Sequence, residues 1–193
     1  MKLNMQTLLY TILIISLLVN TLFITKYFLN NKSHQALVKS NTVITSAFSN
    51  LVNDPKVLLL HAIKGANQTL DIAIYNLQDK EIAEAILKAK KRGVSVRLIT
   101  DAKKAEKSER SAILKIFTRN GIAVKTNPSQ KMHLKMTIVD KTLVTTGSYN
   151  YTEASAYENQ EQLLTIKNKE LAKEWTNSFT ALWNSPHYEI WNK

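Results

Sequence analysis

The longest apolar stretch of the chain lies near its N-terminus, where residues 8–24 contain no charged side chain. The stretch lies between Lys2 and Lys26, and it reaches about 20 residues if it starts at Met5, which is enough for a helix to cross a bilayer. A cleaved signal peptide is the alternative, but its apolar core usually has about 7–15 residues and ends in small residues. Bulky residues follow here, so we expect residues 1–29 to form an uncleaved membrane anchor.

Two arguments about the orientation of this anchor disagree. Three lysines follow the apolar stretch (Lys26, Lys32 and Lys39) and only Lys2 precedes it, which by the positive-inside rule would place the C-terminal side in the cytoplasm. The similarity to a signal anchor with a short basic patch at its N-terminus favours export. We expect the rest of the chain to lie outside the cytoplasm, and to be secreted if the segment is cleaved.

Beyond the anchor, residues 30–41 are polar, and we expect them to be a linker. In residues 42–193, apolar positions alternate in some segments and follow helical spacing in others. The expected strands are residues 42–48, 69–75, 95–100, 123–126, 135–139, 143–146 and 161–166. The expected helices are residues 54–65, 79–93, 106–120 and 170–183.

The order of these elements predicts an α/β domain that spans residues 42–193. Strands and helices alternate between residues 69 and 100, which is typical of a parallel crossover. The two strands within residues 135–146 follow each other closely and predict an antiparallel hairpin. The sheet should therefore be mixed.

Composition adds a basic charge to this picture. The chain has a formal net charge of +11, and the four lysines of the first 42 residues leave +7 for the remainder. Basic residues cluster at 88–92 and 103–110. A basic domain favours polyanionic partners such as nucleic acid or an anionic lipid surface. The chain has no cysteine and its four histidines are scattered, so we expect neither a metal site nor a cofactor.

The candidate chemistry lies in the segment HLKMTIVDKTLVTTGSYN. Its polar positions follow the pattern HxKx4Dx6GSxN at His133, Lys135, Asp140, Gly147, Ser148 and Asn150. His133 and Lys135 are two residues apart, so an extended chain points both side chains to the same face. The ammonium can hold a phosphoryl oxygen while a neutral imidazole attacks phosphorus.

The remaining positions of the segment have supporting roles. Asp140 lies seven residues after His133, so on an unbroken strand its side chain would point to the opposite face. We therefore assign Asp140 a role in the turn rather than in catalysis. The turn itself is expected at Lys141-Thr142. Gly147 ends the second strand and lets the backbone approach a ligand. Ser148 and Asn150 offer neutral donors to a phosphate oxygen.

This segment resembles the HKD motif of the phospholipase D superfamily. The resemblance implies an α-β-α sandwich around a mixed sheet and a metal-independent phosphodiesterase that forms a covalent phosphohistidine. It also implies a Glu shortly after the motif that orients the histidine. Glu161 matches that position better than Glu153 or Glu158, because it lies in an apolar run. A carboxylate there would fix the tautomer of His133.

One motif supplies only half of such a site. Neither His34, His61 nor His187 has a lysine two residues later, so the chain holds no second copy. Small relatives with a single motif suggest the solution, which is a homodimer whose two motifs meet on a two-fold axis.

Three functions remain open at this point. A non-specific endonuclease that cuts DNA or RNA is favoured by the single motif and the basic domain. A phospholipase D that hydrolyses a phospholipid headgroup is favoured by the membrane segment at residues 8–24. A third hypothesis, a membrane-tethered binding protein without activity, is disfavoured because binding requires no nucleophile. We expect the endonuclease.

Overall fold

The computed structural model describes residues 4–39, 41–51 and 53–192 of the chain. It divides into two units, one that ends at residue 40 and one that starts at Asn41. The first unit is the helix α1, Met5–Lys39. This helix continues through most of the segment that we expected to be a polar linker.

Within α1, the stretch Leu9–Tyr27 has 19 residues and a mean hydropathy of 1.8. Its large apolar side chains, such as Leu13, Leu17 and Phe23, are exposed in the isolated chain. By length and composition this part of α1 can cross a membrane.

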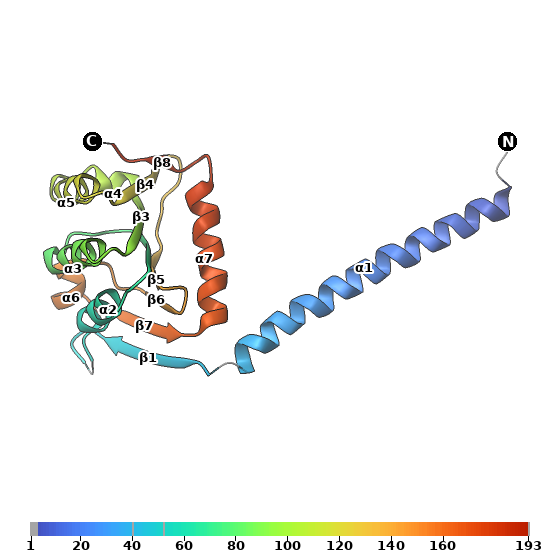
Figure 1. The fold of residues 1–193 in the computed structure, drawn as a ribbon, viewed down its shortest axis with the longest axis horizontal. Coiled ribbons are helices and arrows are strands. Elements are labelled where there is room, and N and C mark those ends of the chain that lie inside the picture. The colour runs from blue at the N-terminus through green and yellow to red at the C-terminus, as the bar shows by residue number, and fades with distance from the viewer. Residues whose placement is uncertain (1–3, 40, 52, 193) are drawn as a thin grey trace. The chain divides into compact units, whose positions relative to one another are not determined.

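The second unit is built on one mixed sheet (Figure 1). Its spatial order is β1-β7-β6-β5-β2-β3-β4-β8. Strands β2, β3 and β4 run parallel, and every other neighbouring pair is antiparallel. The strands are β1 Val43–Phe48, β2 Thr69–Ile74, β3 Ser95–Asp101, β4 Ala123–Asn127, β5 Lys135–Val139, β6 Leu143–Gly147, β7 Gln162–Lys167 and β8 Glu189–Ile190.

Helices cover both faces of this sheet. The helices of this unit are α2 Pro55–Lys64, α3 Lys80–Lys91, α4 Ala102–Ala105, α5 Ser108–Arg119, α6 Glu153–Tyr157 and α7 Lys169–Asn184. Figure 1 shows α7 along one face and α2, α3 and α5 on the other. Leu59, Ile82 and Phe117 belong to the core on the α2 side, and Ala172 and Phe179 belong to the core under α7. The expected α-β-α sandwich with a mixed sheet is therefore confirmed.

Side-chain caps explain why two of these helices start where the sequence predicts. The Asp54 carboxylate accepts a hydrogen bond from Lys56 N at 2.7 Å, just before α2. The Asp79 carboxylate accepts from Glu81 N at 2.9 Å and from Ile82 N at 3.0 Å at the start of α3. A carboxylate at this position satisfies N–H groups that have no partner inside the helix.

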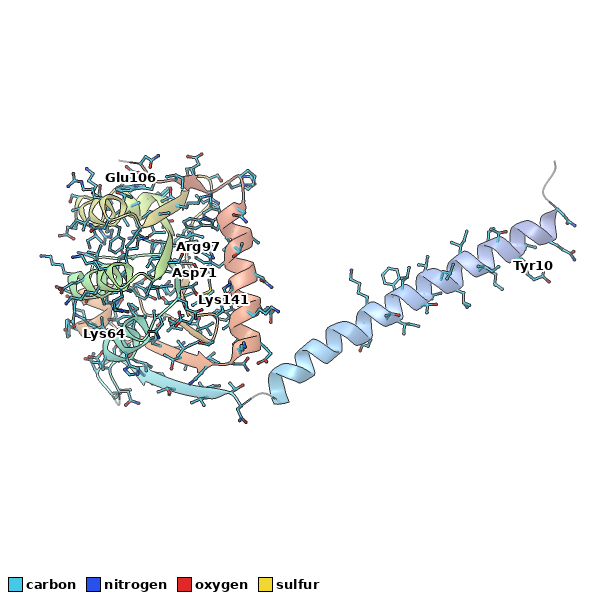
Figure 2. All side chains as sticks on the ribbon, viewed as in Figure 1. Tyr10, Lys64, Asp71, Arg97, Glu106 and Lys141 are labelled. Carbon is cyan, nitrogen blue, oxygen red and sulfur yellow. The ribbon has the colours of Figure 1, made fainter. Side chains whose placement is uncertain are left out.

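A partly buried ion pair lies between the sheet and α7. The guanidinium of Arg97 on β3 donates to both carboxylate oxygens of Asp71 on β2, at 2.7 and 2.8 Å. It also lies 4.9 Å from the ring centroid of Phe179 and 5.5 Å from that of Trp183 on α7. Figure 2 shows the labelled pair Asp71 and Arg97 inside the domain, beside α7. A bidentate pair satisfies the polar groups that this face of the sheet buries.

Some elements differ from the expectation. The helix expected at residues 106–120 is preceded by a separate short helix, α4, which was not predicted and starts where the Asp101 carboxylate accepts from Lys104 N at 3.0 Å. Helix α5 then begins at Ser108. The short elements α6 and β8 were not predicted, since five and two residues are too few to show a periodic pattern.

The hairpin turn lies one residue earlier than expected. Its central residues are Asp140 and Lys141, with φ of 51° and 53°, and Thr142 N donates to Val139 O at 2.9 Å. Two successive residues with positive φ match the twist of the flanking strands. The Asp140 carboxylate also accepts from three backbone N–H groups at 2.8–2.9 Å, those of Asn67, Gln68 and Thr69. Asp140 therefore ties the hairpin to the start of β2, away from the imidazole of His133.

We predict that Asp140→Ala destabilises the domain by about 2–3 kcal/mol, because charge-assisted hydrogen bonds are lost and alanine disfavours positive φ. Partial burial raises the pKa of Asp140, but the three N–H groups outweigh it and the pKa is lowered overall. The stabilisation is therefore present above the pKa of an unfolded aspartate and disappears as the pH falls through the lowered value. Urea unfolding at several pH values measures it. The exposed Glu174→Ala is the control, and equal loss in both variants would contradict the role of Asp140.

Candidate active site

The polar residues of the motif, apart from Asp140, lie at one edge of the sheet. Strands β2, β3 and β4 end at this edge, and the antiparallel strand β5 begins there, since Lys135 pairs with Ile74. Strand β6 ends at the same edge and β7 starts there, since Gly147 pairs with Leu163. The carboxyl edge of parallel strands is where open α/β sheets commonly bind ligands.

His133 precedes β5 directly and is exposed. Its ring lies against the ring of Tyr75, which follows β2, with centroids 4.4 Å apart and an interplanar angle of 57°. The Lys135 ammonium lies 3.5 Å from His133 Nδ1 and donates to the His133 carbonyl oxygen at 3.1 Å. The sequence prediction that the two side chains share a face agrees with this geometry.

The surroundings of His133 favour its neutral form. Its pKa is lowered by partial burial, then by the positive charges of Lys135 and Lys131, while Asp101 acts in the opposite direction. The pKa of Lys135 is also lowered, first by burial, with Glu161 opposing the shift and Lys131 adding to it. A neutral imidazole next to an ammonium combines a nucleophile with a group that can hold an anion.

Because Lys131 lowers the pKa of His133, Lys131→Ala should raise that pKa. A nucleophilic imidazole must be neutral, so activity falls as the pH drops through the pKa. We expect the acidic limb of the profile of kcat/KM against pH to move to higher pH in this variant. Lys115→Ala, an exposed charge on α5, is the control. A limb that stays in place, or moves to lower pH, would contradict the assigned electrostatics.

Ser148 and Glu161 bind each other. The Ser148 hydroxyl donates to the Glu161 carboxylate and accepts from Gln162 N at 3.1 Å. Glu161 also accepts from Asn159 Nδ2 at 3.2 Å and from Ser155 Oγ at 3.4 Å. Within the described part of the chain, no hydrogen bond joins Glu161 to His133. One chain alone therefore does not make the expected contact, and it holds the Ser148 hydroxyl on a carboxylate rather than free for a phosphate.

The need for glycine at position 147 comes from the neighbouring strand. Gly147 has a φ of 151°, and a Cβ there would lie 2.1 Å from Gln162 O. The close approach is thus to the backbone of β7, which differs from the expected approach to a ligand. The Oδ1 atom of Asn150 is buried and has no hydrogen-bond partner among the described residues.

Two pockets lie at this edge of the sheet. One has a volume of about 410 Å³ and contains Phe48, Leu51, Ser148 and Glu161 among its lining residues. The other has a volume of about 430 Å³ and contains Tyr75, Lys104 and Lys131. Across the described ranges, no group of three or more His, Cys, Asp or Glu side chains could hold a metal ion.

Sequence reasoning missed Tyr75 and did not connect Lys104 and Lys131 with His133. The cluster of lysines at residues 103–107 was a usable signal, because it follows a strand that ends at the same edge. Tyr75 carried no such signal. Its position beside His133 depends on the pairing of β2 with β5, which joins segments that are far apart in the sequence.

The α-β-α sandwich around a mixed sheet, with His133 and Lys135 at one edge of that sheet, is the fold of the phospholipase D superfamily. Residues 59–183 match the model of the family described as cardiolipin synthase, PLD-like domain. The chain belongs to this family.

Individual relatives agree with this assignment. The chain is 31% identical over 126 residues to a mitochondrial cardiolipin hydrolase of Chlamydomonas reinhardtii, covering 65% of this chain and 56% of that protein. It is 29% identical over 122 residues to a phospholipase D of Rickettsia conorii, covering 63% and 60% of the two chains. The chain thus spans less than two thirds of the length of these relatives.

A solved structure shows the same fold. The phospholipase D family member Nuc from Salmonella typhimurium superposes with a TM-score of 0.74 and 27% sequence identity. The match covers 79% of this chain and all of the Nuc chain.

Proposed function

We propose that the chain is a metal-independent endonuclease that cuts phosphodiester bonds of DNA and RNA through a covalent phosphohistidine on His133. The observation that carries this proposal is the exposed imidazole with a lowered pKa, 3.5 Å from the Lys135 ammonium. A lysine-rich pocket at the same edge of the sheet supports a polyanionic substrate.

The reaction has two steps. His133 of one chain attacks phosphorus in line, a P–N bond forms, and the bond to the leaving oxygen breaks. His133 of the second chain must carry the opposite protonation state: as an imidazolium it donates the proton that the leaving oxygen requires and becomes neutral. That second imidazole then takes a proton from water, the resulting hydroxide attacks phosphorus, and cleavage of the P–N bond restores the first histidine.

Other residues of the motif stabilise the charge that develops on the phosphoryl oxygens. Lys135 places an ammonium beside His133, and the side-chain amide of Asn150 can donate through Nδ2. Ser148 contributes once its hydroxyl leaves the Glu161 carboxylate. Glu161, freed in the same rearrangement, would orient the imidazole. Donors fixed in advance are effective because they need little reorganisation during the reaction.

The proposed site needs two chains, since each carries one motif. The simplest assembly is a homodimer in which the two motifs face each other across a two-fold axis. Each dimer then holds one composite site, with one histidine as nucleophile and the other as general acid.

This arrangement predicts how mixed dimers behave. If wild-type and His133→Ala chains are co-expressed in equal amounts and pair at random, only dimers with two wild-type chains should be active. Activity per total chain should fall to about one quarter, following the square of the wild-type fraction. Quantifying both chains by mass spectrometry and measuring activity checks this. A fall to one half would show that each chain works independently.

A phospholipase D is the second candidate. It is favoured by α1, whose apolar stretch can cross a membrane, and by the relatives named cardiolipin hydrolase and phospholipase D. In either case we propose that α1 anchors the enzyme to a membrane with residues 42–193 outside the cytoplasm. Cleavage of the anchor would make the enzyme a secreted one.

A substrate panel separates the two candidates. The full chain in detergent, wild type and His133→Ala, is incubated in excess EDTA with plasmid DNA, RNA and vesicles of phosphatidylcholine or cardiolipin. Cleavage of nucleic acid by the wild type alone supports the endonuclease. Hydrolysis of lipid alone would replace it with the phospholipase, and full inhibition by EDTA would contradict the metal-independent mechanism.

A further inference from the structure

The pocket of about 430 Å³ beside His133 has a strongly basic lining. It lies between the end of β3, the short helix α4 and the loop that follows β4. Its charged residues are Lys103, Lys104, Lys107, Lys131 and Asp101. Four ammonium groups thus meet a single carboxylate, and such an excess of one charge in a concave surface attracts the opposite charge.

The single carboxylate is already engaged by the backbone. Asp101 is 4% exposed, and its two oxygens accept from Lys104 N at 3.0 Å and from Met132 N at 3.2 Å. These bonds start α4 and fix the chain just before His133. The shape of the adjacent loop is also set by backbone contacts, since Asn127 Oδ1 accepts from Ser129 N at 3.0 Å and from Gln130 N at 3.1 Å. The pocket is therefore built by the fold rather than by flexible side chains alone.

Tyr75 joins this pocket to the reacting group. The ammonium nitrogens of Lys131, Lys104 and Lys135 lie 5.0, 5.1 and 5.3 Å from the centroid of its ring. The same ring lies 4.4 Å from that of His133. Cation–π attraction to one ring offsets only part of the repulsion among three like charges. An anion that binds among the three ammonium groups would offset the remaining repulsion.

The anion at the pocket cannot be the phosphate that reacts, because that phosphate must lie on His133 with Lys135 beside it. A neighbouring anionic group of the same substrate is in reach of the pocket through the Tyr75 side. Successive phosphodiesters joined by short linkers are the defining feature of a nucleic-acid strand.

We propose that this pocket binds the phosphodiester next to the one that is cut, so that the enzyme prefers strands with at least two successive phosphates. The proposal rests on the phosphodiesterase activity proposed above and adds a second anion subsite to it. Lys103 and Lys107 serve only this subsite, because neither contacts His133 or Tyr75 in the described structure.

The test compares substrates that differ by one phosphate. With the full chain in detergent, kcat/KM is measured for bis(4-nitrophenyl) phosphate, for thymidylyl-thymidine with one phosphodiester, and for the thymidine trinucleotide with two. We expect the trinucleotide to react about tenfold faster per bond than the dinucleotide, which corresponds to about 1.4 kcal/mol of added binding. The double variant Lys103→Ala, Lys107→Ala should reduce this ratio to near one and leave the two single-phosphate substrates unchanged.

The control variant Lys91→Ala, Lys173→Ala removes the same charge from the exposed surfaces of α3 and α7 and should keep the wild-type ratio. A ratio that is the same in all three proteins would overturn the subsite. An equal loss of kcat/KM on every substrate in the Lys103→Ala, Lys107→Ala variant would overturn the subsite too. The two lysines would then act through general attraction of anions or through the stability of the fold.

Two further outcomes separate the subsite from its premises. No hydrolysis of the trinucleotide, of plasmid DNA or of RNA would overturn the proposed function, and the subsite with it. The lipid arm compares vesicles of cardiolipin, which has two phosphodiesters, with vesicles of phosphatidylglycerol, which has one. If replacing Lys103 and Lys107 lowers the hydrolysis of cardiolipin but not that of the oligonucleotides, the proposal of a nucleic-acid substrate is overturned.

Discussion

Replacing His133 with alanine should abolish phosphodiester hydrolysis, with a fall in turnover of at least about 10⁴-fold. The imidazole is both the nucleophile and, from the second chain, the general acid, so the variant loses both groups of the composite site at once. The two side chains that contact it, the ring of Tyr75 and the amine of Lys135, do not supply an equivalent nucleophile and acid. Single-turnover assays at high enzyme concentration would measure the loss.

The variant should fold normally, which makes the result interpretable. His133 is exposed and lies in the segment before β5, so its removal should change the free energy of unfolding by less than about 0.5 kcal/mol. The matched control is His61→Ala, an exposed histidine on α2 that should keep wild-type activity. Wild-type turnover in a folded His133→Ala protein would refute the proposed mechanism.

Lys135→Ala should lower kcat by roughly 10²–10³-fold, the size of effect seen when one preorganised donor to a developing oxyanion is lost. Lys135 places its ammonium next to the imidazole of His133. The pKa of Lys135 is lowered, and in its protonated form the side chain carries three N–H donors. Because Lys135 also lowers the pKa of His133, the acidic limb of the pH profile should move to higher pH in the same variant. The combination of both changes distinguishes a clamp at the site from a remote structural lysine.

Lys167→Ala is the control for Lys135, since Lys167 ends β7 at the opposite edge of the sheet and is exposed. It should keep both the rate and the pH profile of the wild type. A Lys135→Ala protein with undiminished kcat would remove Lys135 from the mechanism, even if its pH profile had moved.

The parts of this fold that could be predicted are those with local causes. Asp54 and Asp79 cap their helices through contacts two or three residues away, and the hairpin of β5 and β6 follows from alternation over a short segment. The same is true of His133 and Lys135, whose common face depends only on their spacing. The limit of this reasoning appears at Asp101, whose side chain starts the short helix α4, an element that apolar spacing alone did not indicate.

The parts that could not be predicted depend on which strands pair. Tyr75 reaches His133 because β2 lies beside β5, and Glu161 meets Ser148 because β7 lies beside β6. A resemblance in sequence indicated that Glu161 belongs to the site, but not that one chain by itself would bind it to Ser148. Contacts of this kind follow from strand order and register, which no local pattern encodes.

The apolar stretch of α1 has a consequence for an enzyme whose site is divided between two chains. If α1 is embedded in a bilayer, the chains diffuse in two dimensions, and their encounter is set by the number of copies per unit of membrane area. Confinement of this kind raises the effective concentration of one chain around another without any added contact. Hydrolysis would then respond steeply to crowding of the membrane, and a chain released from it would lose activity by dilution alone.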